Sequence, residues 1–205
     1  GLRDPLGGQI KFDGVALNSL AIKTRGQKVS ILFQQAQAPI STRAYDFVMS
    51  ARHPWISRWA GPTRDDQDIV VESLSQMGLE ALMHRDVGSL SGGERRRVEL
   101  AATVAQNAQT ILLDEPVNHL DLHYQINLLQ GALKKWRAEG RAVVMVMHDL
   151  NLAIRFSDHL LCLCGDGSTL QGETSVVATT ENLSTLLRYP LQELTLGDRS
   201  FFIPT

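Results

Sequence analysis

The sequence predicts an α/β fold built on a largely parallel sheet. In its second half, short apolar runs at 110–113, 142–147 and 160–164 alternate with segments of helical periodicity at 122–139 and 151–156. Continuous apolar strands of this kind are expected in a parallel sheet that helices cover on both faces. A mostly helical stretch near 45–107 interrupts the pattern, which suggests an inserted helical subdomain.

The first half supplies two strands and three helices. Strands are expected at 8–13, before the Asp13-Gly14 turn, and at 29–33. The helical segments, whose apolar residues recur at helical spacing, are 45–52, 65–82 and 94–105. In the last of these, Arg95, Arg96 and Arg97 are expected on the polar side.

Composition limits the classes of function. The chain has 205 residues, of which 43% are apolar and 20% charged, as expected for one soluble domain with a sizeable core. Its net charge of −2 argues against nucleic-acid binding. No apolar run approaches the ~20 residues that cross a bilayer, and no signal-peptide pattern opens the chain. We therefore expect a cytoplasmic protein with, at most, a peripheral membrane role.

A glycine-rich turn, Leu90-Ser91-Gly92-Gly93-Glu94, directly precedes a predicted helix. Two glycines let the backbone approach an anion closely, and the start of the helix offers free N–H groups. The Ser91 hydroxyl adds another donor. The turn is therefore a candidate phosphate site, the alternative being a serine-capped helix that binds nothing.

Four polar residues are expected at the carboxyl ends of strands, where open α/β sheets bind ligands. Asp114 and Glu115 follow an apolar strand, and in phosphoryl-transfer sites such acids hold Mg²⁺ and polarise the attacking water. His148 ends the next strand, so its imidazole is expected near these acids and a γ-phosphate. The Gln34 amide could reach Mg²⁺ or the water. The alternatives are an acidic turn, a structural histidine and an isolated glutamine.

Four segments, in order along the chain, resemble the signature, Walker B, D-loop and switch-histidine motifs of the ATPases of ABC transporters. They are LSGGE at 90–94, LLDEP at 112–116, NHLD at 118–121 and MHDLN at 147–151. Gln34 falls where the Q-loop glutamine of that family belongs. The resemblance covers nearly the whole chain and implies a single ABC ATPase domain at 1–205. Its P-loop NTPase (RecA-like) core would comprise 1–39 and 107–205, and its helical subdomain 40–106.

The resemblance also implies roles for residues of the core. Glu115 would be the general base, His148 the γ-phosphate sensor, and Asp114 the Mg²⁺ acid. Gln34 would join the nucleotide and Mg²⁺ to the transporter. Asp121, counted with the nucleotide-binding residues, would communicate across a dimer. The implied cofactors are ATP and Mg²⁺.

The implied assembly is a head-to-tail homodimer in which Ser91, Gly92 and Gly93 bind the nucleotide of the partner chain. Three short segments are similar to importers of iron–siderophores, haem and cobalamin: ARHP at 51–54, NHLDLHYQ at 118–125 and HDLNLAIRFSDHL at 148–160. The expected partners are transmembrane permease subunits and a periplasmic or lipoprotein substrate-binding protein. The expected location is the cytoplasmic face of the bacterial inner membrane.

Members of this family carry a G-x-x-x-x-G-K-[ST] loop that cradles the phosphates, and none of the lysines here completes it. Residues 1–8 resemble the segment just after that loop, so we expect an N-terminally truncated cassette with exposed apolar surface. Alone, it is expected to bind ATP weakly and to hydrolyse it negligibly. The alternative function is a truncated, non-catalytic cassette that acts as a dimerisation or regulatory partner.

Overall fold

A computed structural model describes the chain except for residues 1–4, 35–40, 58, 119 and 198. Residue 119 of the NHLD segment and the first half of segment 1–8 therefore lie outside the described residues. The chain forms two compact units, Gly1–Val146 and Met147–Thr205, and each is described by itself.

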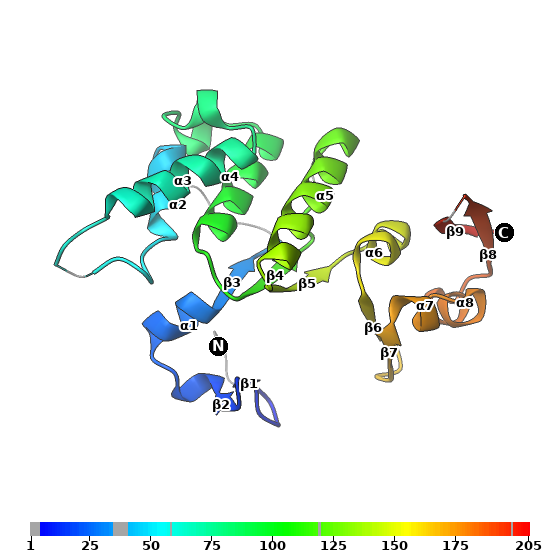
Figure 1. Ribbon diagram of the computed structural model, residues 1–205. Helices are drawn as coiled ribbons and strands as arrows, with labels where there is room; N and C mark the ends of the chain where they lie inside the picture. The colour runs from blue at the N-terminus through cyan, green and yellow to red at the C-terminus, as the bar shows by residue number, and fades with distance from the viewer. Residues whose placement is uncertain (1–4, 35–40, 58, 119, 198) are drawn as a thin grey trace. The chain divides into compact units, whose positions relative to one another are not determined.

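The first unit contains a three-stranded parallel sheet in the order β3-β4-β5 (Figure 1). The strands are β3 (Val29–Leu32), β4 (Thr110–Asp114) and β5 (Ala142–Val146). The three runs predicted as strands here, and their parallel pairing, are confirmed. Because parallel strands end at the same edge, the residues that follow β3 and β4 are brought together.

One face of this sheet packs into the core of the unit. Leu32 and Leu113 are neighbours in the register and are buried beside the helices α4 (Gly92–Ala105) and α5 (Leu122–Ala138). The other face carries Ile31 and Val144, of which Val144 is 56% exposed. The prediction that both faces are covered is therefore wrong for the described sheet. Exposed and half-buried residues alternate along β5, as expected for a strand covered on one side.

The strand predicted at 160–164 is confirmed, but its expected parallel pairing is wrong. In the second unit, β6 (His159–Leu163) pairs antiparallel with β7 (Thr169–Glu173). The two strands are joined by a tight turn in which Gly167 has a φ of 87° and Asp166 bonds to Ser168. A turn of this kind brings the next segment, β7, beside β6 as a hairpin partner. The pairing of β6 therefore depends on the turn and strand that follow it directly in the sequence.

The helical segment predicted near 45–107 is confirmed as three helices that pack on one another. Besides α4, these are α2 (Ala44–Ser50) and α3 (Arg64–Gln76). Thr63 and Asp66 form a capping box at the start of α3, with two reciprocal hydrogen bonds of 3.0 and 3.2 Å. The caps and the apolar spacing explain why these residues form helices.

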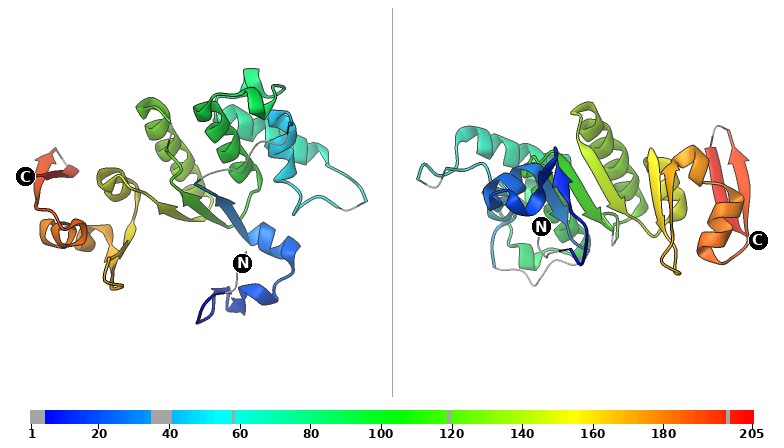
Figure 2. Two further views of the ribbon diagram at one scale, coloured as in Figure 1. Left: turned by 180° about the vertical axis from the view of Figure 1, so that it is seen from behind. Right: turned by 90° about the horizontal axis from the view of Figure 1, so that it is seen from below.

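The remaining elements are short, and two further views show how they follow one another in each unit (Figure 2). In the first unit they are β1 (Lys11–Phe12), β2 (Val15–Ala16), η1 (Leu17–Ser19), α1 (Ile22–Lys28), η2 (Glu80–Leu82) and η3 (Val87–Ser89). In the second they are α6 (Leu150–Phe156), α7 (Thr174–Val177), α8 (Thr180–Leu187), β8 (Leu191–Leu196) and β9 (Arg199–Pro204). Among the described helices, none combines the length and apolarity that crossing a bilayer requires.

A buried ion pair ties the loop after α2 to α3 and α4. The Arg52 guanidinium lies 2.9 Å from Asp66 Oδ1 and also donates to the Ala105 carbonyl, and both charged side chains are about 6% exposed. Burial alone would raise the pKa of Asp66. The hydrogen bonds from Thr63 and the Arg52 guanidinium outweigh that effect and hold the pKa below its ordinary value of 3.8.

We expect Asp66→Ala to lower the free energy of unfolding by about 3–5 kcal/mol, because it leaves a buried guanidinium unpaired. Urea denaturation at neutral pH measures this. The control is Asp68→Ala on an exposed side of α3, with an expected loss within ~0.5 kcal/mol. A carboxylate with a depressed pKa stabilises fully above its ordinary value of 3.8 and loses that contribution as pH falls through the folded pKa. The gap between wild type and Asp66→Ala should therefore narrow below that pH, and a constant gap would contradict this account.

Candidate active site

Two of the predicted site residues meet at the carboxyl end of the sheet. Gln34 lies just beyond β3, and Glu115 follows β4 directly. The Gln34 amide Nε2 donates a hydrogen bond of 2.9 Å to Glu115 Oε1, across 81 residues of sequence. The parallel pairing of β3 and β4 therefore brings these two side chains together.

Glu115 is buried and strained. Its side chain is 5% exposed, and its φ of 47° lies in the left-handed region that a non-glycine residue rarely adopts. Its N–H donates to the Val146 carbonyl at 3.0 Å, and its Oε2 accepts a hydrogen bond from Asn118 Nδ2. Such strain costs about 1–3 kcal/mol and persists only where the surroundings fix it. Glu115 is thus held on both sides, with its two carboxylate oxygens oriented.

Asn118 was not predicted as a site residue, although it opens the NHLD segment. Its position in the sequence could have indicated a site residue, because it is the first side-chain amide after the two acids and lies three residues beyond Glu115. Its backbone N–H also donates to the Glu115 carbonyl at 3.3 Å. The loop after β4 therefore folds back on the acid that it carries.

Arg96 of α4 reaches the same loop. It is 4% exposed, and its Nη2 donates to the carbonyls of Asp114 and Glu115, both at 2.8 Å. The prediction that it faces the polar side of the helix is therefore wrong. Leu100 and Thr103, four and seven residues further on, are both buried, so spacing placed Arg96 on the inner face.

Asp114 ends β4 and is half-buried. Among the described residues, no group forms a hydrogen bond or ion pair with its carboxylate, so its oxygens are open to a ligand. Carboxylate and amide oxygens are the ligands that Mg²⁺ prefers. Asp114 and the neighbouring Gln34 therefore fit a magnesium site in their donor chemistry.

The glycine-rich turn starts α4 through a capping box. Ser91 Oγ and Ser91 N–H donate to Glu94 Oε2 at 2.7 and 2.8 Å, and Glu94 N–H donates back to Ser91 Oγ at 3.3 Å. These bonds lower the pKa of Glu94. Gly92 and Gly93 are the first residues of α4, and a side chain at Gly92 would meet nothing within 4 Å. The chain's own packing therefore does not require a glycine at 92.

The other two predicted residues lie beyond Glu115 in the sequence. Asp121 caps α5, where its carboxylate accepts the Tyr124 N–H at 3.0 Å. His148 belongs to the second unit and is exposed there. Because the two units are described separately, the proximity of its imidazole to Glu115 stays a prediction.

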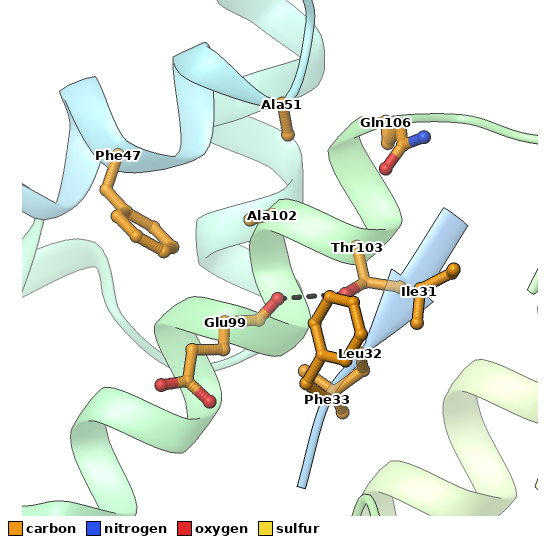
Figure 3. Close-up of a pocket in the computed structure, with 9 residues that line it drawn as sticks. All are labelled: Ile31, Leu32, Phe33, Phe47, Ala51, Glu99, Ala102, Thr103 and Gln106. Atoms are coloured by element: carbon orange, nitrogen blue, oxygen red, sulfur yellow. Dashed lines mark hydrogen bonds between the residues drawn. The ribbon is translucent and has the colours of Figure 1, made fainter. Parts of the chain in front are cut away.

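A hollow of about 170 Å³ lies between β3, α2 and α4 (Figure 3). Phe33, which precedes Gln34, and Phe47 of α2 line its apolar wall, and Glu99 and Thr103 of α4 line another side. Thr103 Oγ1 donates to the Glu99 carbonyl at 3.0 Å, as the dashed line shows. The hollow thus borders both the strand that leads to Gln34 and the helix that carries Arg96.

Comparison with known proteins identifies the family. The family model described as ABC transporter matches residues 1–118, which is more than half of the chain. The chain belongs to the ABC transporter family. Its fold is that of an ABC ATP-binding cassette: a metal-chelate type ABC transporter in an inward-facing conformation superposes with a TM-score of 0.76 and 28% identity, over 87% of this chain and 72% of that one.

Relatives within the family are named for import. The chain is 34% identical to the petrobactin import ATP-binding protein FpuD of Bacillus anthracis, over 93% of this chain and 70% of that protein. It is 31% identical to the iron(3+)-hydroxamate import ATP-binding protein FhuC of Bacillus subtilis, over 86% and 65%. Others are named for import of hemin and of cobalamin. The chain spans 64% to 70% of the length of the first four relatives.

We expect Ser91→Ala to lower the free energy of unfolding by about 1 kcal/mol, because it removes the cap of α4. Gly92→Ala is the matched substitution, expected to leave stability unchanged or slightly higher, since the site has space and alanine favours helix. Urea denaturation of both variants measures the difference. A Gly92→Ala loss as large as that of Ser91→Ala would show that the turn is tightly packed after all.

Proposed function

We propose that this protein is the ATP-binding subunit of an ABC importer, which couples ATP hydrolysis to uptake of an iron–siderophore, haem or cobalamin-type compound. The observation that carries the proposal is the hydrogen bond between Gln34 and the buried Glu115 at the carboxyl end of a parallel sheet. The fold and the family membership support it. The import names of the relatives support the class of transported compound.

In this proposal Glu115 is the general base. Water attacks the γ-phosphorus, the bond from that phosphorus to the bridging oxygen breaks, and the proton of the water passes to a Glu115 carboxylate oxygen. The hydrogen bonds from Gln34 and Asn118 aim the carboxylate. Asp114 and Gln34 would hold Mg²⁺, which would neutralise charge on the phosphate oxygens.

The second half of each ATP site comes from another copy of the chain. We assign Ser91, Gly92 and Gly93 to the nucleotide of the partner, His148 to sensing the γ-phosphate, and Asp121 to communication across the dimer. Open space around Gly92 supports close approach of an external group. A dimeric ATP-binding cassette bound to ADP and Pi, 28% identical with a TM-score of 0.73 over 84% of this chain and 76% of that one, supports a head-to-tail homodimer.

The proposed assembly also contains permease subunits and a periplasmic or lipoprotein substrate-binding protein. It would place this chain on the cytoplasmic face of the inner membrane. The hollow beside Phe33 supports a contact with a permease, because it exposes apolar groups next to Gln34. No lysine of the 205 residues completes a G-x-x-x-x-G-K-[ST] pattern. We therefore infer that these residues alone bind ATP weakly.

In the full-length protein, we expect Glu115→Gln to lower Mg²⁺-ATP turnover by roughly 10²–10⁴-fold, because it removes the proton acceptor. ATP binding should persist, since the amide keeps the shape of the side chain. Phosphate release and nucleotide affinity measure the two effects. The control is Glu181→Gln, an exposed residue in the first turn of α8, which should turn over like wild type.

Equal turnover by Glu115→Gln and wild type would refute Glu115 as the base. A wild-type protein that dimerises with ATP but never releases phosphate would instead favour the alternative, a non-catalytic dimerisation or regulatory partner.

A further inference from the structure

Arg96 holds the backbone beside Gln34, Asp114 and Glu115. Its Nη2 donates to the carbonyls of Asp114 and Glu115, and its Nη1 donates to the Phe33 carbonyl at 2.6 Å, directly before Gln34. The remaining Nη1 bond goes to Glu99 Oε2 at 3.0 Å, one turn along the same helix. One planar guanidinium therefore bridges the ends of β3 and β4.

These bonds act on a strained residue. Three of the groups that hold the backbone of Glu115 are known: Val146 accepts its N–H, and Arg96 and Asn118 donate to its carbonyl. Of these groups, only Arg96 comes from outside the sheet and the loop. A guanidinium can hold two adjacent carbonyls and a third at once, because its donors form a rigid fork, whereas a lysine ammonium is a point charge on a flexible stem. The contact therefore holds the backbone from which the Glu115 side chain extends.

Arg96 also lies on the helix that begins with the glycine-rich turn. It lies five positions after Ser91, which is about 7.5 Å along a helix. A shift of α4 as a rigid rod would carry Arg96, and with it the carbonyls of Asp114 and Glu115. In the proposed dimer, the start of α4 faces the nucleotide of the partner chain.

We propose that Arg96 is a positioning residue that makes the orientation of Glu115 depend on the position of α4. The start of α4 binds the nucleotide of the partner chain in the proposed dimer. Binding of that nucleotide therefore changes the position of the general base, Glu115, in the chain's own site. The inference rests on the proposed function, and it adds a means by which the two ATP sites regulate each other. Arg97 does not share this role, since it donates to the carbonyls of Met77 and Gly78 and stacks on Tyr124.

The first test needs no catalysis. Hydrogen exchange is measured on wild type, on Arg96→Lys and on the double variant Arg96→Met/Glu99→Leu, which removes both buried charges together so that neither is left unpaired. The matched control is Arg95→Met, the neighbouring arginine, whose side chain is 28% exposed and lies 3.6 Å from Glu99 Oε1. We expect the Glu115 and Asn118 amides to exchange roughly tenfold faster in both Arg96 variants, with α3 unchanged. Unchanged exchange at these two amides, or an equal change throughout the double variant, would overturn the proposal.

The second test uses turnover by the full-length protein. Misplacing a catalytic group by about 1 Å can cost roughly 100-fold in rate, so both Arg96 variants should lose at least about tenfold in kcat with KM for ATP within threefold. Where wild type responds cooperatively to ATP, the variants should lose that cooperativity, and Arg95→Met should match wild type. A variant that keeps wild-type kcat and cooperativity would refute the role of Arg96. Turnover that is insensitive to Glu115→Gln would instead refute the proposed function. The hydrogen-exchange result would still show whether Arg96 holds the backbone of Glu115.

Discussion

The buried guanidinium of Arg96 is the contact on which the arrangement of the strand ends depends. Removing such a charge from water is costly, and the site offsets that cost with one carboxylate and three carbonyls. The three carbonyls are unusual partners for a buried arginine. They are backbone acceptors that lie where the two parallel strands end. A helix whose inner face were wholly apolar would leave those acceptors buried and unsatisfied. The polar ends of the sheet and the position of α4 therefore require each other.

This constraint also explains why the acids differ although they are neighbours in sequence. Glu115 is fixed through its backbone and both carboxylate oxygens, which suits a group that must meet a water in one orientation. The side chain of Asp114 has no such bonds among the described residues, while its carbonyl is held by Arg96. A metal ligand needs free oxygens on a fixed backbone. The same arginine thus supports two different kinds of site residue.

Local patterns in the sequence were sufficient for most of this picture. Apolar runs and caps predicted β3, β4, β5 and the helices. The rule that parallel strands end together predicts that His148 lies near the acids, which stays a prediction, whereas the contact between Gln34 and Glu115 at the strand ends was not itself predicted. The pairing of β6 was not predictable from its apolar run, because a strand can bond to any neighbour that the chain brings to it. Arg96 was misjudged for a related reason. Charge suggests exposure, but partners from distant segments can bury it.

At the start of α4, the Glu94 carboxylate and a phosphate would compete for the same hydrogen-bond donors. The Ser91 hydroxyl and N–H are the donors that a phosphate would use, and the Glu94 carboxylate now occupies both. Those bonds keep the pKa of Glu94 low, so the carboxylate stays charged at neutral pH and would repel a phosphate. In the proposed dimer, an incoming nucleotide would have to displace Glu94 or bind the N–H groups beyond it, next to the open space at Gly92. A cap that stabilises the free helix is in this way also a barrier to its ligand, and seating a nucleotide would exchange one set of bonds for another at the helix that carries Arg96.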